Sequence, residues 1–111
     1  MAIEKIVLKH LSELNIPVFL EEPTKKPCEY LIIEKLGGRK INYLWQSTVA
    51  VQSFSETLSK TVELNEKVME KMEHLIASDE VTKCSINSNY NFTETQTKRY
   101  RYQAIFDIYH Y

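Results

Sequence analysis

The pattern of apolar and polar positions predicts an α+β protein. Apolar residues recur every three to four positions over residues 2–14 and from 56 to about 77, which predicts two amphipathic helices. Apolar runs, several of them alternating with polar residues, predict strands over residues 16–20, 29–36, 41–54, about 81–92 and 98–111. The order is typical of an antiparallel sheet of about four to five strands with both helices packed on one face. We expect residues 1–111 to form one domain.

Turn and cap residues set the expected boundaries of these elements. Gly37 and Gly38 separate two strand-like runs, and both tolerate positive φ, so we expect a hairpin turn there. Ser55 precedes the second helix and is the predicted N-cap. The polar segment 93–97 predicts the turn between the last two strands. Pro23 and Pro27 bracket a charged loop that cannot be a central strand.

The faces of these elements predict the core. In the strand 41–54, one face is expected to be buried, and it contains Ile41, Tyr43, Trp45, Ser47, Val49 and Val51. The apolar set of the second helix contains Leu58, Val62, Val68, Met69, Met72, Leu75 and Ile76. Burying these seven side chains would stabilise the fold by roughly 10–20 kcal/mol before conformational entropy is subtracted. We therefore expect this helix to lie on the sheet.

The closing strand interleaves basic and aromatic residues, which is also typical of proteins that bind single-stranded nucleic acid. A base-stacking surface needs its rings and cations exposed on the same face. Strand alternation instead places the arginines on one face and groups the following residues on the other: Tyr100, Tyr102, Ala104, Phe106 and Ile108. We therefore expect these five residues in the core and Arg99 and Arg101 in an outer row, with nucleic-acid binding kept as an alternative.

The charge of the chain does not favour a polyanion partner. The net charge is −1, and residues 81–111 carry four basic against two acidic side chains, so the first 80 residues sum to −3. No large positive field surrounds such a molecule. The acidic first part and the slightly basic last hairpin are, however, candidates for two complementary surfaces.

No catalytic or metal-binding pattern is found in the sequence. Cys28 and Cys84 are far apart, and His10, His74 and His110 have no ligand at metal-binding spacing. No serine lies in a nucleophile-elbow context. We therefore predict no catalytic residue, cofactor, metal or membrane span, and an enzyme is the least favoured class.

Three charged segments are candidates for a subunit or partner interface. They are the loop residues Glu21, Glu22, Lys25 and Lys26, the basic pair Arg39 and Lys40, and the closing-strand arginines Arg99 and Arg101. Each segment could equally be solvated surface. Together they fit a protein that packs against copies of itself.

Three stretches give the chain a resemblance to a known family. They are IPVFLEEPTKKPCEYLIIEKLGG (16–38), VAVQSFSETLSKTVELNEKVMEKM (49–72) and SNYNFTETQTKRYRYQAIFDI (88–108). In their order and polarity they resemble the tail terminator proteins, also called tail completion or minor capsid proteins, of long-tailed bacteriophages. The resemblance extends from the first helix to the last strand.

The resemblance implies a structural protein of virion assembly, encoded by a phage or prophage. Family members form a ring, usually a hexamer, that caps the tail tube and joins it to the head connector, although the isolated subunit can be a monomer. DNA passes through such a ring without specific binding, and no cofactor belongs to the family. The implied location is the virion neck, and the host cytoplasm during assembly. Another phage neck or tail-tube protein is the nearest alternative.

Overall fold

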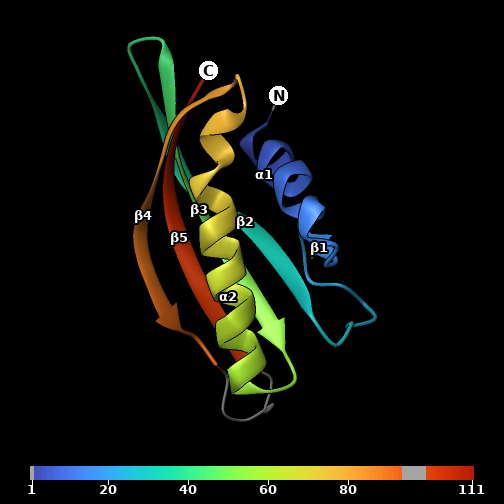
Figure 1. Ribbon diagram of the computed structural model, residues 1–111. Helices are drawn as coiled ribbons and strands as arrows, with labels where there is room; N and C mark the ends of the chain where they lie inside the picture. Colours follow the sequence, from blue (N-terminus) through green and yellow to red (C-terminus); the bar gives the residue numbers. More distant parts are fainter. Residues whose placement is uncertain (1, 94–99) are drawn as a thin grey trace.

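Residues 2–93 and 100–111 are described in the computed structural model (Figure 1). The chain starts with helix α1 (Ile3–Leu11), a 3-10 turn (Ser12–Leu14) and the short strand β1 (Val18–Phe19). The hairpin strands β2 (Tyr30–Ile41) and β3 (Leu44–Ser55) follow, then α2 (Leu58–Glu73) and a 3-10 turn (Leu75–Ala77). Strands β4 (Val81–Asn91) and β5 (Tyr100–His110) complete the fold.

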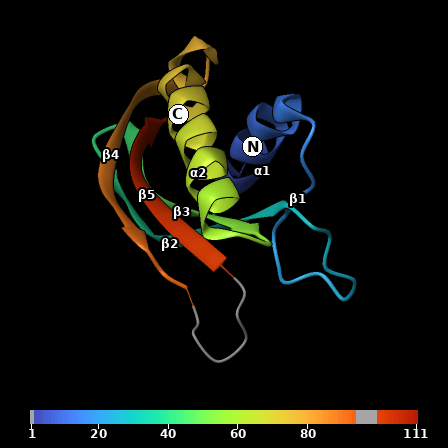
Figure 2. The ribbon, with the colours of Figure 1, turned by 60° about the horizontal axis from the view of Figure 1, so that its bottom comes forward.

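The five strands form one sheet in the order β1-β2-β3-β5-β4. All neighbouring pairs are antiparallel except β1 with β2, so the sheet is mixed. Figure 2 shows both helices on the same side of the curved sheet. The predicted α+β fold with two helices on one face is confirmed, and the parallel pairing of β1 is the difference from the expected purely antiparallel sheet.

The main core lies between the sheet and the two helices. The sheet contributes alternate residues of its central strands: Leu31, Ile33, Val49, Val51, Ala104, Phe106 and Ile108. The helical side contributes Ile3, Ile6, Val7, Leu11, Leu64, Val68, Met72 and Leu75. The covered face of the sheet is thus apolar along its middle. On the opposite face, called the outer face below, no helix of residues 2–93 and 100–111 lies (Figure 2).

The predicted glycine turn is wrong. Gly37 and Gly38 lie inside β2, and the chain turns at Asn42 and Tyr43 because Ile41 pairs with Leu44. Asn42 has a φ of 56°, the left-handed conformation that asparagine tolerates better than most residues. The register of β2 against β3 also shifts between Lys35 and Gly37. The glycines therefore follow a bulge and do not close a hairpin.

The predicted cap of the second helix is also wrong. Ser55 is the buried last residue of β3, and the side chain of Thr57 accepts a hydrogen bond of 3.2 Å from the backbone N–H of Lys60. Leu64 is buried in the core although it was not in the predicted apolar set. Leu58 and Ile76, which were in that set, are exposed because they lie at the two ends of the helical segment.

Two predicted buried faces are confirmed only in part. In the strand 41–54, Ser47, Val49 and Val51 are buried, but Ile41, Tyr43 and Trp45 are exposed because their part of the hairpin extends past the core. In the closing strand, Ala104, Phe106 and Ile108 are core residues. Tyr100 and Tyr102 are only half-buried, since they pair with the last residues of β3 at the end of the sheet where α2 begins. Their predicted place in the core is wrong.

Candidate interaction surfaces

The outer face of the sheet has its own aromatic cluster near the beginning of β2. The rings of Tyr30 and Phe54 stack with their centroids 4.5 Å apart, and Phe19 and Ile32 pack against them. The hydroxyl of Tyr30 donates a hydrogen bond of 3.2 Å to Glu22. The loop between β1 and β2 is therefore joined to this end of the outer face.

Arg101 extends this cluster across the sheet. Its guanidinium lies 4.3 Å from the ring centroid of Phe92 and 5.5 Å from that of Phe54. Its Nε donates a hydrogen bond of 3.2 Å to the carbonyl oxygen of Phe92. Arg101 thus lies on the outer face, as expected, but it packs between rings of its own chain. Arg99 lies outside the described residues.

The position of Arg101 bears on whether the outer face could bind nucleic acid. Sorting the closing strand by face separated its own tyrosines from Arg101, but neighbouring strands place Phe54 and Phe92 beside this arginine. A cation and one exposed ring, that of Phe92, therefore do share the outer face, whereas Phe54 is buried. The arginine covers those rings, however, and a stacked base would have to displace it.

Hydrogen-bonded polar side chains cross the rest of the outer face. Asp107 accepts from Thr48 and from Asn87, each at 3.0 Å. In another row, Gln52 donates to Gln103 at 3.0 Å, and Gln103 donates to the hydroxyl of Tyr90 at 2.6 Å. Such pairs across neighbouring strands hold the strands in register and give the face a polar, wettable centre.

The hairpin formed by residues 36–45, here called the arm, extends beyond the helices at the top of Figure 1. It exposes large apolar side chains, and Tyr43 at its tip is 90% exposed. Three more large apolar side chains are exposed on the arm: Leu36 is 49% exposed, Ile41 41% and Trp45 42%. Because several large apolar side chains are exposed on one projection, the arm is a candidate interaction surface.

The arm also carries the predicted basic pair. The Nζ of Lys40 lies 5.8 Å from the ring centroid of Trp45, and the Nε of Arg39 donates a hydrogen bond of 3.0 Å to Gln46. No acidic residue occurs between positions 36 and 45. The arm is therefore a basic and aromatic projection, and Arg39 and Lys40 lie on its side and not at its tip.

The remaining predicted interface residues lie at the other end of β2. Glu22 pairs with Lys26 at 3.3 Å across an exposed loop, and Glu21 and Lys25 are exposed beside them. An exposed pair of this kind contributes little to stability. The structure therefore does not bring the predicted residues together. It places the loop and Arg101 at one end of the sheet and Arg39 and Lys40 at the other.

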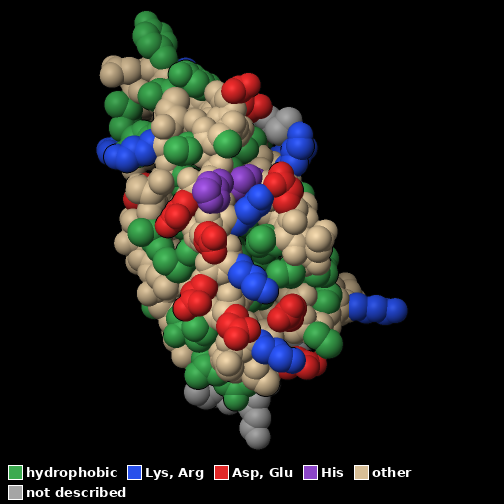
Figure 3. Space-filling model, in the orientation of Figure 1, with side chains coloured by type: hydrophobic (Ala, Val, Ile, Leu, Met, Phe, Trp, Pro, Cys, Tyr) green, Lys and Arg blue, Asp and Glu red, His purple; other side chains and the backbone are tan. Residues whose placement is uncertain are grey.

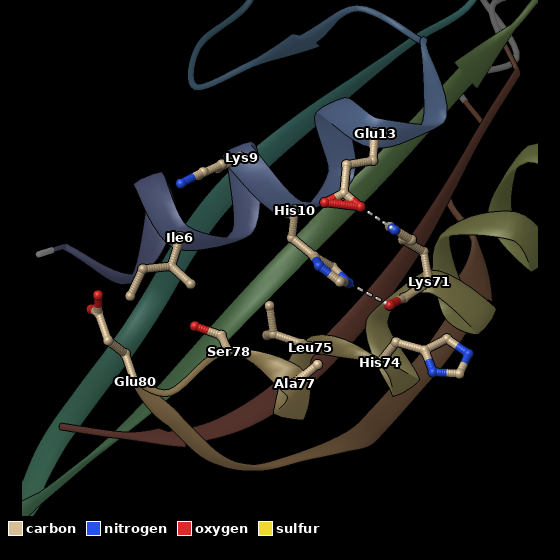
Figure 4. Close-up of a pocket in the computed structure, with 10 residues that line it drawn as sticks. All are labelled: Ile6, Lys9, His10, Glu13, Lys71, His74, Leu75, Ala77, Ser78 and Glu80. Carbon is tan, nitrogen blue, oxygen red and sulfur yellow. Dashed lines mark hydrogen bonds and ion pairs between the residues drawn. The ribbon is translucent and has the colours of Figure 1, made fainter.

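A pocket of about 440 Å3 lies between α1 and α2 (Figure 4). His10 and Glu13 point from the α1 side toward Lys71: the Nε2 of His10 donates a hydrogen bond of 2.6 Å to the carbonyl oxygen of Lys71, and the Nζ of Lys71 lies 2.6 Å from Glu13. The hydrogen bond and charge of Lys71 hold the pKa of Glu13 below its ordinary value. These contacts fasten α1 to α2.

A second hollow, here called the α2–β4 groove, has a volume of about 230 Å3 and is lined by Met69, Met72, Glu73, Cys84, Ile86 and Phe106. Burial, with a smaller contribution from Asp107, raises the pKa of the Cys84 thiol to about 11. Ile86 is 49% exposed at the rim. The spacing of apolar residues in the second helix could not predict this groove, because the groove forms only where β4, a strand distant in sequence, lies beside α2.

Within residues 2–93 and 100–111, no group of three or more His, Cys, Asp or Glu side chains could hold a metal ion. No helix in these ranges is both long and apolar enough to cross a membrane. Cys28 and Cys84 are not joined by a disulfide. No protein-family model matches the chain, and no curated protein matches it in sequence.

Proposed function

We propose that the chain is a structural protein of phage tail assembly, namely a tail terminator. In this role, copies of the chain form a ring, usually a hexamer in the family that it resembles. The ring caps the tail tube, joins it to the head connector and lets DNA pass without specific binding. The protein then resides in the virion neck, after assembly in the host cytoplasm.

The observation that supports this proposal best is the arm. A lone subunit exposes Leu36, Ile41, Tyr43 and Trp45 on a projecting hairpin, where its own core cannot cover them. A projection can enter a hollow on another copy without blocking the hollow on its own. Contacts of that kind join subunits head to tail, and they produce a ring when the rotation closes. The arm therefore favours a self-assembling protein, and the resemblance of the whole chain favours this particular one.

Electron microscopy and native mass spectrometry test the proposal. The purified chain is measured alone and then after mixing with the tail-tube protein encoded beside it. A terminator gives closed rings at the ends of tubes, and the number of subunits follows from the ring mass. A tail-tube protein, the nearest alternative, would instead polymerise into tubes of its own. Finding neither rings nor capped tubes would contradict the proposal.

One observation favours a second candidate, a small protein that binds single-stranded nucleic acid. Arg101, Phe92 and Tyr90 lie together on the outer face. A fluorescence-polarisation titration with a labelled oligonucleotide at two salt concentrations decides this. Phosphate contacts require binding that weakens steeply as salt rises, and we expect no such binding.

A further inference from the structure

The contact described below rests on the proposed ring. It would join two surfaces, the arm of one subunit and a hollow on the next. The arm needs an apolar hollow with negative charge, because it carries exposed aromatic side chains together with Arg39 and Lys40. The partner surface must also lie elsewhere on the subunit, so that each copy can donate an arm and receive one at the same time.

The α2–β4 groove has the required apolar lining. Met69 and Met72 form its α2 side, and Phe106, Cys84 and Ile86 form its floor and opposite wall. Methionine side chains adapt to the shape of a partner, and their sulfur atoms make favourable contacts with aromatic rings. The groove measures about 230 Å3, and a cavity of roughly 150 Å3 is enough to hold a benzene ring. One aromatic side chain therefore fits.

The charges beside the groove are complementary to those of the arm. Glu73 lines it, and Glu66 lies seven residues earlier, about two helical turns, on the same side of α2. Lys67 and Lys71 line a different hollow, on the α1 side of the same helix. Figure 3 shows acidic side chains along α2 with hydrophobic ones beside them on the β4 side. The β4 side of the helix is therefore acidic and apolar.

We propose that the arm of one copy inserts into the α2–β4 groove of the next copy, with Tyr43 between the partly buried Met69 and the exposed Ile86 and with Lys40 beside Glu73. Different elements form the arm and the groove: β2 and β3 form the arm, and α2, β4 and β5 form the groove. Each subunit therefore has one donor and one acceptor surface. The contact repeats around a ring and leaves the outer face of the sheet available for other components of the neck.

Disulfide cross-linking between two different variants tests the contact. Both carry Cys28→Ser and Cys84→Ala, one adds Tyr43→Cys on the arm, and the other adds Ile86→Cys in the groove. The two are mixed at the highest soluble concentration and oxidised. We expect a cross-linked dimer as the main product of the mixture, and little dimer from either variant alone. The matched control replaces Ile86→Cys with Leu58→Cys, an exposed position at the other end of α2.

The outcomes separate this contact from the proposed function. Rings without the mixed cross-link overturn the contact and leave the terminator proposal standing. Dimers of the Tyr43→Cys variant alone mean that arms meet tip to tip, and they also overturn it. The mixed cross-link in open chains without rings supports the contact and contradicts the terminator. Monomers without any cross-link overturn the contact, and the terminator proposal is then decided by whether rings cap tubes after mixing with the tail-tube protein.

A charge exchange provides a second measurement on the full chain. Lys40→Glu and Glu73→Lys should each weaken self-association about threefold or more, and the double variant should recover most of the loss. Sedimentation at several concentrations gives the association constants. Both positions are exposed, so circular dichroism melting curves should stay unchanged. If the double variant loses as much association free energy as the two single variants together, these two residues do not pair.

Discussion

The beginning and the end of β2 differ sharply in burial. Its first four residues are all buried and its last eight are all exposed, although they form one continuous strand. The first half lies between α1 and the aromatic cluster of the outer face, and it pairs with β1 as well as β3. The second half pairs only with β3 in the described ranges.

The buried beginning of β2 therefore stabilises the fold, and its exposed end does not. Leu31 and Ile33 contribute to the core, and hydrophobic burial there stabilises the monomer. Leu36 and Ile41 contribute nothing to that core, so their apolar character needs another reason. The proposed contact with a second copy would supply the reason, and the following predictions test how sharp the boundary is.

The largest expected effect is on the free energy of unfolding, at two leucines of the same strand. Leu31→Ala should destabilise the protein by about 2–5 kcal/mol, because Leu31 is fully buried and its removal leaves a cavity. Leu36→Ala, on the exposed half, should change stability by about 0.5 kcal/mol or less. Urea unfolding of both variants measures the difference. Similar losses at the two positions would contradict the division of β2.

Hydrogen exchange should show the same boundary without a mutation. The hydrogen-bonded amides of the arm should exchange about a hundredfold faster than those of residues 31–33, because little packing opposes local opening there. In assembled protein the arm amides should slow while those of the core stay unchanged. Exchange that remains fast after assembly would mean that the arm does not enter an interface.

Two adjacent glycines give a smaller and finer test. A Cβ at Gly37 would meet no atom within 4 Å, and φ is not positive there, so Gly37→Ala should stabilise the hairpin by about 0.4–1 kcal/mol. A Cβ at Gly38 would lie 3.1 Å from the carbonyl oxygen of Gln46, so Gly38→Ala should destabilise it by about 1 kcal/mol. Amide exchange in the arm reports both changes, and equal effects would contradict this geometry.

The smallest expected effect is the pH dependence of the contact that fastens α1 over the buried half of β2. Lys71 lowers the pKa of Glu13 in the folded state, so the folded protein binds fewer protons at this site than the unfolded chain. The stabilisation is present above the ordinary value of 4.5 and is lost as pH falls through the lower folded pKa. Glu13→Gln should remove a small part of the acid sensitivity seen in melting temperatures, and high salt should do the same. An unchanged profile at low salt would contradict this role.

The sequence predicted the elements well because their apolar periods are local. The two helices, the hairpins and the core residues Val49, Val51 and Phe106 all follow from spacing within one segment. The turn at Asn42 could not be predicted in this way. A glycine pair is a stronger hairpin signal than Asn-Tyr, and only the pairing of β3 with β5 shows how far the strands extend.

The candidate surfaces were less predictable because they combine distant segments. Arg39 and Lys40 were identified as a basic pair, but the exposed Tyr43 and Trp45 beside them were expected to be buried. Strand alternation says which residues share a face, and it does not say whether a helix covers that part of the face. Likewise, nothing in the sequence distinguishes Met72 and Cys84 from other apolar residues, and only the tertiary fold places them in one groove.

The bulge after Lys35 decides which side chains of the arm lie on each of its sides. Because side chains alternate along a strand, one extra residue reverses which of them face each side from that point on. Arg39 pairs with Gln46 toward the outer face only because of this offset. Deleting the extra residue would move Arg39, Lys40 and Ile41 to the opposite sides of the arm, while the β3 residues keep their sides through unbroken pairing with β5 and Leu31 and Ile33 stay in place. The loss of a single codon would thus change which side chains the arm presents on each side and leave the core unchanged.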